Sequence, residues 1–149
     1  MRIALVDDCP NDLSIMHQFL AEALDTDSVI TEFHNGEDFL QHWSADTFDL
    51  IVLDIYMEQV TGIEIAWVIR ETDPNVCLVF ATTSNEFASE SYEVNACYYL
   101  HKPFLKQQVL AMLDRISQQN LEVSRTVLLP NGERYFYATL FTQITPLTG

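Results

Sequence analysis

The chain has 149 residues, 48% of them hydrophobic, which is enough for one buried core and a short appendage. Its 22 acidic residues outweigh seven Lys and Arg and give a net charge of -15, which disfavours direct binding to nucleic acid or to an anionic membrane, because both need clustered cations. The three cysteines lack the spacing of a metal site, and no apolar run is long enough for a signal peptide or a membrane helix, so we expect a cytoplasmic protein.

The first third of the chain alternates short apolar runs with helical patterns. Ile3–Val6 is a continuous apolar run that predicts a buried strand, and Pro10 follows it at a position typical of a helix start. The helix continues on a stripe of four apolar residues at helical spacing, Leu13, Met16, Leu20 and Leu24. Val29–Phe33 predicts a second strand, Glu37–Trp43 a second helix, and Phe48–Leu53 a third strand that is apolar on both faces and therefore central.

The alternation continues beyond the third strand. Gly62 begins a helix that ends before Pro74, since the residue before a proline avoids helical geometry. Val76–Ala81 predicts the fourth strand, and the capping-box spacing of Thr83 and Glu86 predicts a helix that begins near Ser84.

Cys97–Leu100 predicts the fifth strand. A last helix follows from Phe104 to about Gln119 on the stripe Leu105, Val109, Met112 and Ile116. Five strands that alternate with five helices predict an α/β fold with a parallel sheet covered on both faces.

Polar residues follow the predicted strands, and the carboxyl ends of parallel strands meet at one edge of a sheet. Asp7 and Asp8 follow the first strand, Asp54 the third, Thr82 the fourth and Lys102 the fifth. Gathered carboxylates repel one another and are tolerated when a hard cation such as Mg²⁺ neutralises them.

These residue types suit phosphoryl transfer. A carboxylate acts as a nucleophile toward phosphorus, and Asp54 is the predicted nucleophile. The Thr82 hydroxyl is expected to donate to a phosphoryl oxygen, and the Lys102 ammonium to compensate its charge. Pro103 follows Lys102, and the sequence leaves open whether the bond between them is cis or trans.

Five ordered motifs together resemble the receiver domain of bacterial two-component response regulators, over residues 1–119. They are Leu5-Val6-Asp7-Asp8, Leu53-Asp54-Ile55-Tyr56-Met57, Gly62, Phe80-Ala81-Thr82 and Tyr99-Leu100-His101-Lys102-Pro103-Phe104. The resemblance implies a flavodoxin-like, doubly wound fold, dependence on Mg²⁺, and phosphotransfer from a sensor histidine kinase to Asp54. It implies a phosphoacceptor switch, with intrinsic autophosphorylation and dephosphorylation chemistry only, rather than an enzyme.

The resemblance also implies individual roles around Asp54. Asp8 would contact the metal directly, Asp7 through water, and Tyr56 through its backbone carbonyl. Tyr99 matches the aromatic switch residue of the family, and the surface around the fourth and fifth helices would mediate homodimerisation. Glu58 departs from the pattern, because the family commonly has proline there.

Two alternatives stay open. A Mg²⁺-dependent aspartyl phosphatase usually carries a general acid two residues after its nucleophile, where this chain has Tyr56. A docking module that is never phosphorylated would not need the complete set of acids, Thr82 and Lys102.

The tail, residues 120–149, is expected to form a second region. Arg125–Leu129 and Arg134–Leu140 predict two strands joined by a turn at Asn131-Gly132, which is a strong hairpin signal. The stretch from Leu129 to Phe136 resembles the start of a LytTR-type DNA-binding domain. That domain needs several times this length, so DNA binding is expected only through a complete output domain, which is absent or truncated here.

Overall fold

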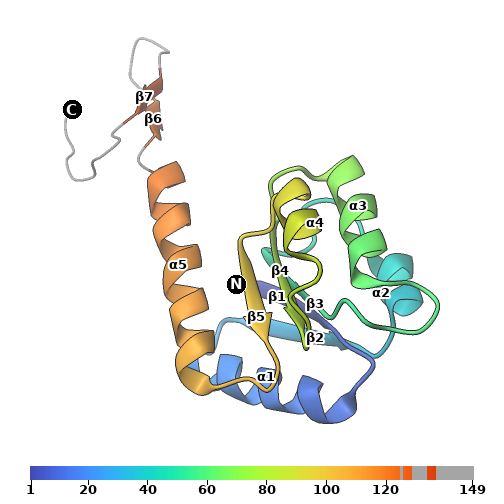
Figure 1. Cartoon of the computed structure of the whole chain (residues 1–149). Coiled ribbons are helices and arrows are strands. Elements are labelled where there is room, and N and C mark those ends of the chain that lie inside the picture. Colours follow the sequence, from blue (N-terminus) through green and yellow to red (C-terminus); the bar gives the residue numbers. More distant parts are fainter. Residues whose placement is uncertain (125, 129–133, 137–149) are drawn as a thin grey trace. The chain divides into compact units, whose positions relative to one another are not determined.

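Five apolar runs form one parallel sheet, coloured from blue to yellow along the chain in Figure 1. In this computed structural model the backbone is described for residues 1–124, 126–128 and 134–136, and the side chains for residues 1–118. The strand order is β2-β1-β3-β4-β5. The strands are β1 (Arg2–Val6), β2 (Val29–Phe33), β3 (Leu50–Leu53), β4 (Cys77–Thr82) and β5 (Tyr98–His101).

Five helices connect or follow these strands, which confirms the predicted α/β, flavodoxin-like fold (Figure 1). They are α1 (Pro10–Ala23), α2 (Gly36–His42), α3 (Gly62–Thr72), α4 (Ala88–Glu93) and α5 (Lys106–Ser124). The order of the strands reverses at β1, which pairs with β2 on one side and β3 on the other. Such a reversal leaves a crevice at the carboxyl ends of the central strands.

The two faces of the sheet bury different side chains. On one face, alternate residues of the central strands join a core cluster with Phe39 of α2 and with Ile65 and Ile69 of α3. The opposite face meets α1 through Leu13 and Met16, which lie beside Leu5, Val52 and Ala81. Because both faces are covered, all four residues of β3 are buried, as the wholly apolar run predicts.

A side-chain cap fixes where α3, the helix after β3, begins. The Thr61 hydroxyl accepts a hydrogen bond from the Glu64 amide at 3.2 Å, and the Glu64 carboxylate accepts one from the Thr61 amide at 2.9 Å. This capping box satisfies two amides that the helix itself leaves unpaired. It therefore holds the loop between β3 and α3, which carries Asp54.

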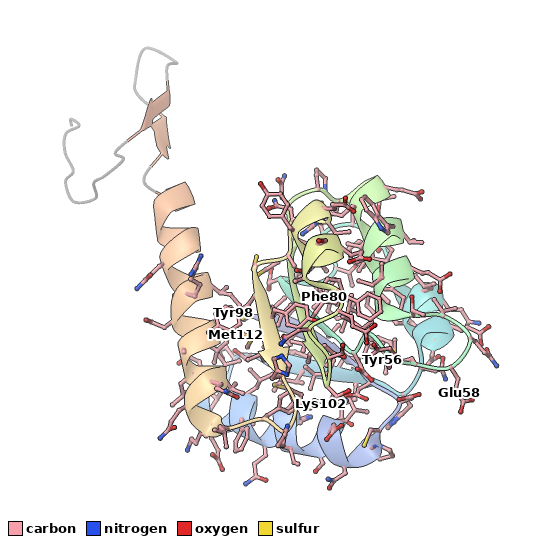
Figure 2. The ribbon with its side chains drawn as sticks, in the orientation of Figure 1. Tyr56, Glu58, Phe80, Tyr98, Lys102 and Met112 are labelled. Carbon is pink, nitrogen blue, oxygen red and sulfur yellow. The ribbon has the colours of Figure 1, made fainter. Side chains whose placement is uncertain are left out.

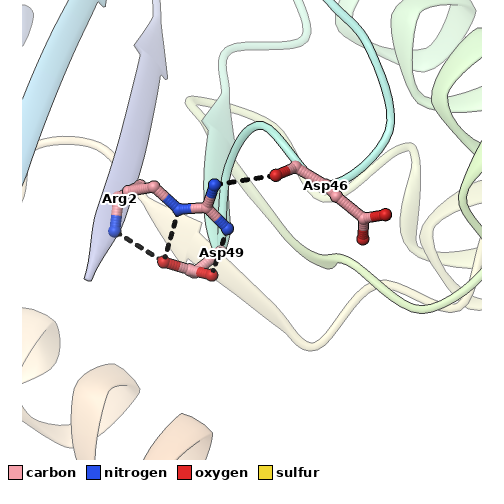
Figure 3. Close-up of polar contacts among 3 residues, drawn as sticks. All are labelled: Arg2, Asp46 and Asp49. Carbon is pink, nitrogen blue, oxygen red and sulfur yellow. Dashed lines mark hydrogen bonds and ion pairs between the residues drawn. The ribbon is translucent and has the colours of Figure 1, made fainter.

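An ion pair ties the amino ends of β1 and β3 together, away from the carboxyl edge (Figure 3). The Arg2 guanidinium donates to both carboxylate oxygens of Asp49, at 3.3 and 3.0 Å, and to the Asp46 carbonyl at 2.7 Å. The hydrogen bond from Arg2 holds the pKa of Asp49 below its ordinary value. Because the pair is exposed, we expect it to fix register more than to add stability.

The prediction that a helix begins near Ser84 is wrong, because α4 begins at Ala88 after the N-cap residue Phe87. The Ser84 hydroxyl accepts from the Glu86 amide at 3.0 Å and so closes a local turn instead of a helix. The capping-box spacing of Thr83 and Glu86 is therefore not used.

The last helix also differs in its limits. It begins at Lys106 instead of Phe104 and continues to Ser124, beyond the predicted end at Gln119. Leu105 and Phe104 both precede the helix; the Leu105 side chain is exposed, although the predicted stripe included it, whereas Phe104 is buried.

Two short strands follow in the tail. They are β6 (Thr126–Leu128) and β7 (Arg134–Phe136), and they pair antiparallel, with Val127 opposite Tyr135. The predicted turn at Asn131-Gly132 and the strand residues beyond Phe136 lie outside the described residues.

The chain divides into two units, residues 1–110 and 111–149. None of the helices in the described part of the chain has the length and apolar character needed to cross a bilayer.

Candidate functional site

Three carboxylates gather at the carboxyl edge of the sheet. Asp7 follows β1 and Asp54 follows β3, and both are buried, while Asp8 is exposed. One ligand oxygen from each lies within 4.8 Å of the others, so this cluster can hold a metal ion. The Cys9 amide donates to Asp7 at 2.9 Å, which fixes that carboxylate at the start of α1.

Lys102 reaches into the cluster from the end of β5, where Figure 2 labels it. Its ammonium nitrogen lies 2.8 Å from Asp7, 2.7 Å from Asp12 and 3.5 Å from Asp54. Burial by itself lowers the pKa of Lys102, but the hydrogen bonds to Asp12 and Asp7 outweigh it and raise the pKa. Lys102 is therefore a fixed cation, and the peptide bond that joins it to Pro103 is cis.

Asp54 ionises less readily than an ordinary aspartate. Burial raises its pKa, and the charge of Asp7 raises it further, while Lys102 opposes both; the result is a pKa of about 7. Such a shift is a cost to folding that a bound cation relieves. The donor set therefore fits a hard divalent ion, which prefers carboxylate oxygens.

Thr82, the last residue of β4, is fully buried at this edge. Among the described residues, no group hydrogen-bonds its hydroxyl oxygen. A buried hydroxyl without a partner costs free energy, so its presence here needs an explanation.

Gly62 lets the loop after Asp54 fold back tightly. Its amide donates to the Ile55 carbonyl at 3.0 Å. A Cβ atom at position 62 would lie only 2.2 Å from the Asp54 carbonyl oxygen. The glycine therefore allows the backbone of α3 to approach the backbone of the candidate nucleophile.

Two tyrosines contact the loop between β4 and α4. The Tyr99 hydroxyl donates to the Ser84 carbonyl at 2.5 Å. Tyr56, which lies beyond the end of β3 in Figure 2, donates to the Glu86 carboxylate at 3.0 Å and packs edge-on against Phe87. This loop follows Thr82 directly in the chain.

Asp12 and the link between Tyr56 and Glu86 were not predicted from the sequence. Asp12 has the acidic character that any first helical turn favours, which conceals its contact with Lys102. The spacing in the sequence could have indicated this contact, because Asp12 lies one helical turn before Met16, on the side of α1 that faces the sheet. Glu58 is exposed and lines a surface hollow together with Asp8 of the acid cluster.

The raised pKa of Asp54 predicts how stability depends on pH. The folded protein binds this proton more tightly than the unfolded chain, whose pKa is near 3.8. In EDTA, stability should therefore fall as the pH rises from about 4 to about 7, by at most about 4 kcal/mol. Urea unfolding at several pH values measures this, and Asp54→Asn should flatten the slope. If the free energy of unfolding of the variant depends on pH to the same extent, groups other than Asp54 cause that dependence.

Comparisons with known proteins agree with this geometry. The family model described as the response regulator receiver domain matches residues 3–114. The sensory transduction protein LytR of Staphylococcus epidermidis is 34% identical over 119 residues, which are 78% of this chain and 46% of that protein. The chain thus spans about half the length of the curated relatives it matches.

Solved structures show the same relationship. The BeF3-activated receiver domain of DrrB superposes with a TM-score of 0.68 at 31% identity, over 78% of this chain and 97% of that one. The response regulator TrrA of Thermotoga maritima in complex with Mg²⁺ and BeF gives a TM-score of 0.64 at 27% identity, over 77% and 97% of the two chains. The chain therefore belongs to the response regulator receiver domain family, whose known role is phosphorylation-dependent signalling in two-component systems.

Proposed function

We propose that Asp54 accepts a phosphoryl group from a sensor histidine kinase. One observation carries the assignment: the buried Asp54 carboxylate lies 3.5 Å from the Lys102 ammonium. Thr82 ends the neighbouring strand at the same edge, and its hydroxyl has no hydrogen-bond partner among the described residues. A carboxylate, a cation and a free donor are what the formation of an acyl phosphate requires.

The residues at the edge also fit Mg²⁺. Asp7, Asp8 and Asp54 would hold the ion, together with the backbone carbonyl of Tyr56, which the family resemblance assigns. When bound, Mg²⁺ neutralises charge on the carboxylates and on the oxygens of the transferring group.

The chemical step uses this chain's own side chains. An ionised Asp54 oxygen forms a bond to phosphorus, and the bond from phosphorus to the donor breaks with its electron pair leaving on the donor. The Thr82 hydroxyl then donates to a phosphoryl oxygen, and Lys102 compensates the added negative charge. The proposed result is a phosphoacceptor switch whose own chemistry is limited to autophosphorylation and dephosphorylation, rather than a turnover enzyme.

The structural response to phosphorylation involves the loop after Thr82. As Thr82 turns toward the phosphoryl group, the loop shifts, and Tyr99 must adjust because its hydroxyl is bonded to the Ser84 carbonyl. Tyr99 is thus the proposed switch residue, and homodimerisation on the surface around α4 the proposed response.

The wider role belongs to the same proposal. Residues 1–119 act as the receiver, and residues 120–149 begin a LytTR-type output domain, so any contact with DNA needs a complete output domain. The thiols of Cys9 and Cys77 form no disulfide, which fits a reducing cytoplasm. There a sensor kinase can transfer its phosphoryl group to Asp54.

Phosphorylation in solution tests the assignment. The protein is incubated with acetyl phosphate and either Mg²⁺ or EDTA, and the product is separated on a phosphate-affinity gel. We expect a retarded band only with Mg²⁺, and none for Asp54→Asn. A retarded band in EDTA, or in the variant, would reject Asp54 as the acceptor.

A further inference from the structure

Asp12 makes a contact that the proposed chemistry does not use. It lies in the first turn of α1, and its carboxylate is 2.7 Å from the Lys102 ammonium, the shortest of the three carboxylate contacts of that lysine. The Lys102 side chain is only 9% exposed, so the contact is formed largely away from solvent. Burial gives such a charge-assisted contact more weight than a surface ion pair has.

The three partners of Lys102 differ in what else they can bind. Within residues 1–118, the carboxylates close enough to share a metal ion are Asp7, Asp8 and Asp54. Asp12 stands outside that group, so a cation offers it no replacement partner. When a cation engages Asp7 and a phosphoryl group occupies Asp54, Asp12 is the one carboxylate that still holds the ammonium in its resting place.

A lysine ammonium has three N–H donors, and three carboxylates surround this one. A phosphoryl group on Asp54 adds new acceptor oxygens at the site of the longest contact. Lys102 can approach them fully only by lengthening its contact with Asp12. The negative charge of Asp12 also repels the phosphoryl oxygens directly, so both effects act in the same direction.

Building on the proposed function, we propose that Asp12 is a positioning residue that restrains Lys102 and competes with the phosphoryl group for its ammonium. Asp12 thereby weakens the hold on a phosphoryl group and favours the unphosphorylated state. Its removal should tighten the binding of a phosphoryl analogue while leaving Mg²⁺ binding little changed. A residue with a merely structural role would weaken both.

The test is calorimetric titration of the whole chain, first with Mg²⁺ and then with beryllofluoride at saturating Mg²⁺. We expect Asp12→Asn to bind beryllofluoride about threefold to tenfold more tightly than the unmutated protein, the effect of one partly buried charge pair. Its Mg²⁺ affinity should change by less than about threefold. Asp12→Glu keeps the charge and should restore the original affinity for beryllofluoride.

Glu22→Gln is the matched control. Glu22 is also an α1 carboxylate paired to a lysine, Lys106 at 3.0 Å, but that pair is exposed. The substitution makes the same change in net charge and should leave both affinities unchanged. Asp12→Ser also removes the carboxylate, and it replaces Asp12→Asn in the test if the thermal transition of Asp12→Asn shows that this variant does not fold.

The outcomes separate the two proposals. If the unmutated protein binds beryllofluoride with Mg²⁺ but the Asp12 variants bind it equally or more weakly, the inference about Asp12 is wrong and the proposed function stands. If the unmutated protein does not bind beryllofluoride at all, the proposed function fails and the role of Asp12 fails with it.

Discussion

Gly62→Ala should destabilise the fold by about 3 kcal/mol or more. The new methyl group would lie 2.2 Å from the Asp54 carbonyl oxygen and 2.9 Å from the Ile55 Cα atom. Both are backbone atoms in a loop that the Thr61 capping box also holds, so neither can move aside cheaply. Urea unfolding followed by circular dichroism measures the loss, and because the displaced loop carries Asp54, phosphorylation should fall as well.

Gly36→Ala is the matched control. Its methyl group would meet the Ile65 Cδ1 atom at 2.7 Å and the Val60 Cβ atom at 3.3 Å. The tip of the Ile65 side chain can turn away, so we expect a loss of only about 1 kcal/mol. Equal losses in the two variants would mean that the close approach at position 62 is not what shapes the nucleophile loop.

Lys102→Ala should cost about 3 kcal/mol in EDTA at pH 8. The substitution removes the cation that contacts three carboxylates and leaves their charges uncompensated in a buried place. In the unmutated protein Asp54 is mostly ionised at pH 8, since its pKa is about 7. Without the opposing charge of Lys102 that pKa rises further, so protonation of Asp54 offsets part of the loss. Urea unfolding in EDTA measures the loss, and added Mg²⁺ should restore part of it.

Lys106→Ala is the control for removing a lysine that lies outside the acid cluster. Lys106 also pairs with a carboxylate, Glu22, but both side chains are about half exposed. Exposed pairs contribute at most about 1 kcal/mol, so the substitution should be nearly neutral. A Lys102 variant as stable as the Lys106 variant in EDTA would show that the acid cluster does not depend on that ammonium.

The sheet and most of the pocket could be predicted because they depend on local patterns. A wholly apolar run such as Leu50–Leu53 identifies a central strand, and in a parallel sheet the residues after such strands meet at one edge. That rule is sufficient to predict that Asp54, Thr82 and Lys102 lie at the same edge. Their roles remain predictions, whereas their placement follows from the fold.

Features that depend on contacts between distant segments were missed. The loop after Thr82 does not begin a helix near Ser84, because Glu86 is engaged by Ser84 and by the distant Tyr56. Asp12 looks like an ordinary residue of a first helical turn, and only the fold brings it to Lys102. Likewise, the Thr82 hydroxyl lacks a hydrogen-bond partner within the described part of the chain, which is a property of its surroundings that spacing in the sequence cannot reveal.

In the proposed function, the carboxyl edge of the sheet directs one phosphoryl group to Asp54. The most direct measurement is to treat the protein with acetyl phosphate and Mg²⁺, reduce the acyl phosphate with borohydride, and locate the reduced residue by peptide mass spectrometry. We predict a single reduced position, Asp54. Reduction at Asp7, Asp8 or Asp12 instead, or at no aspartate in a folded protein that binds Mg²⁺, would contradict the assignment.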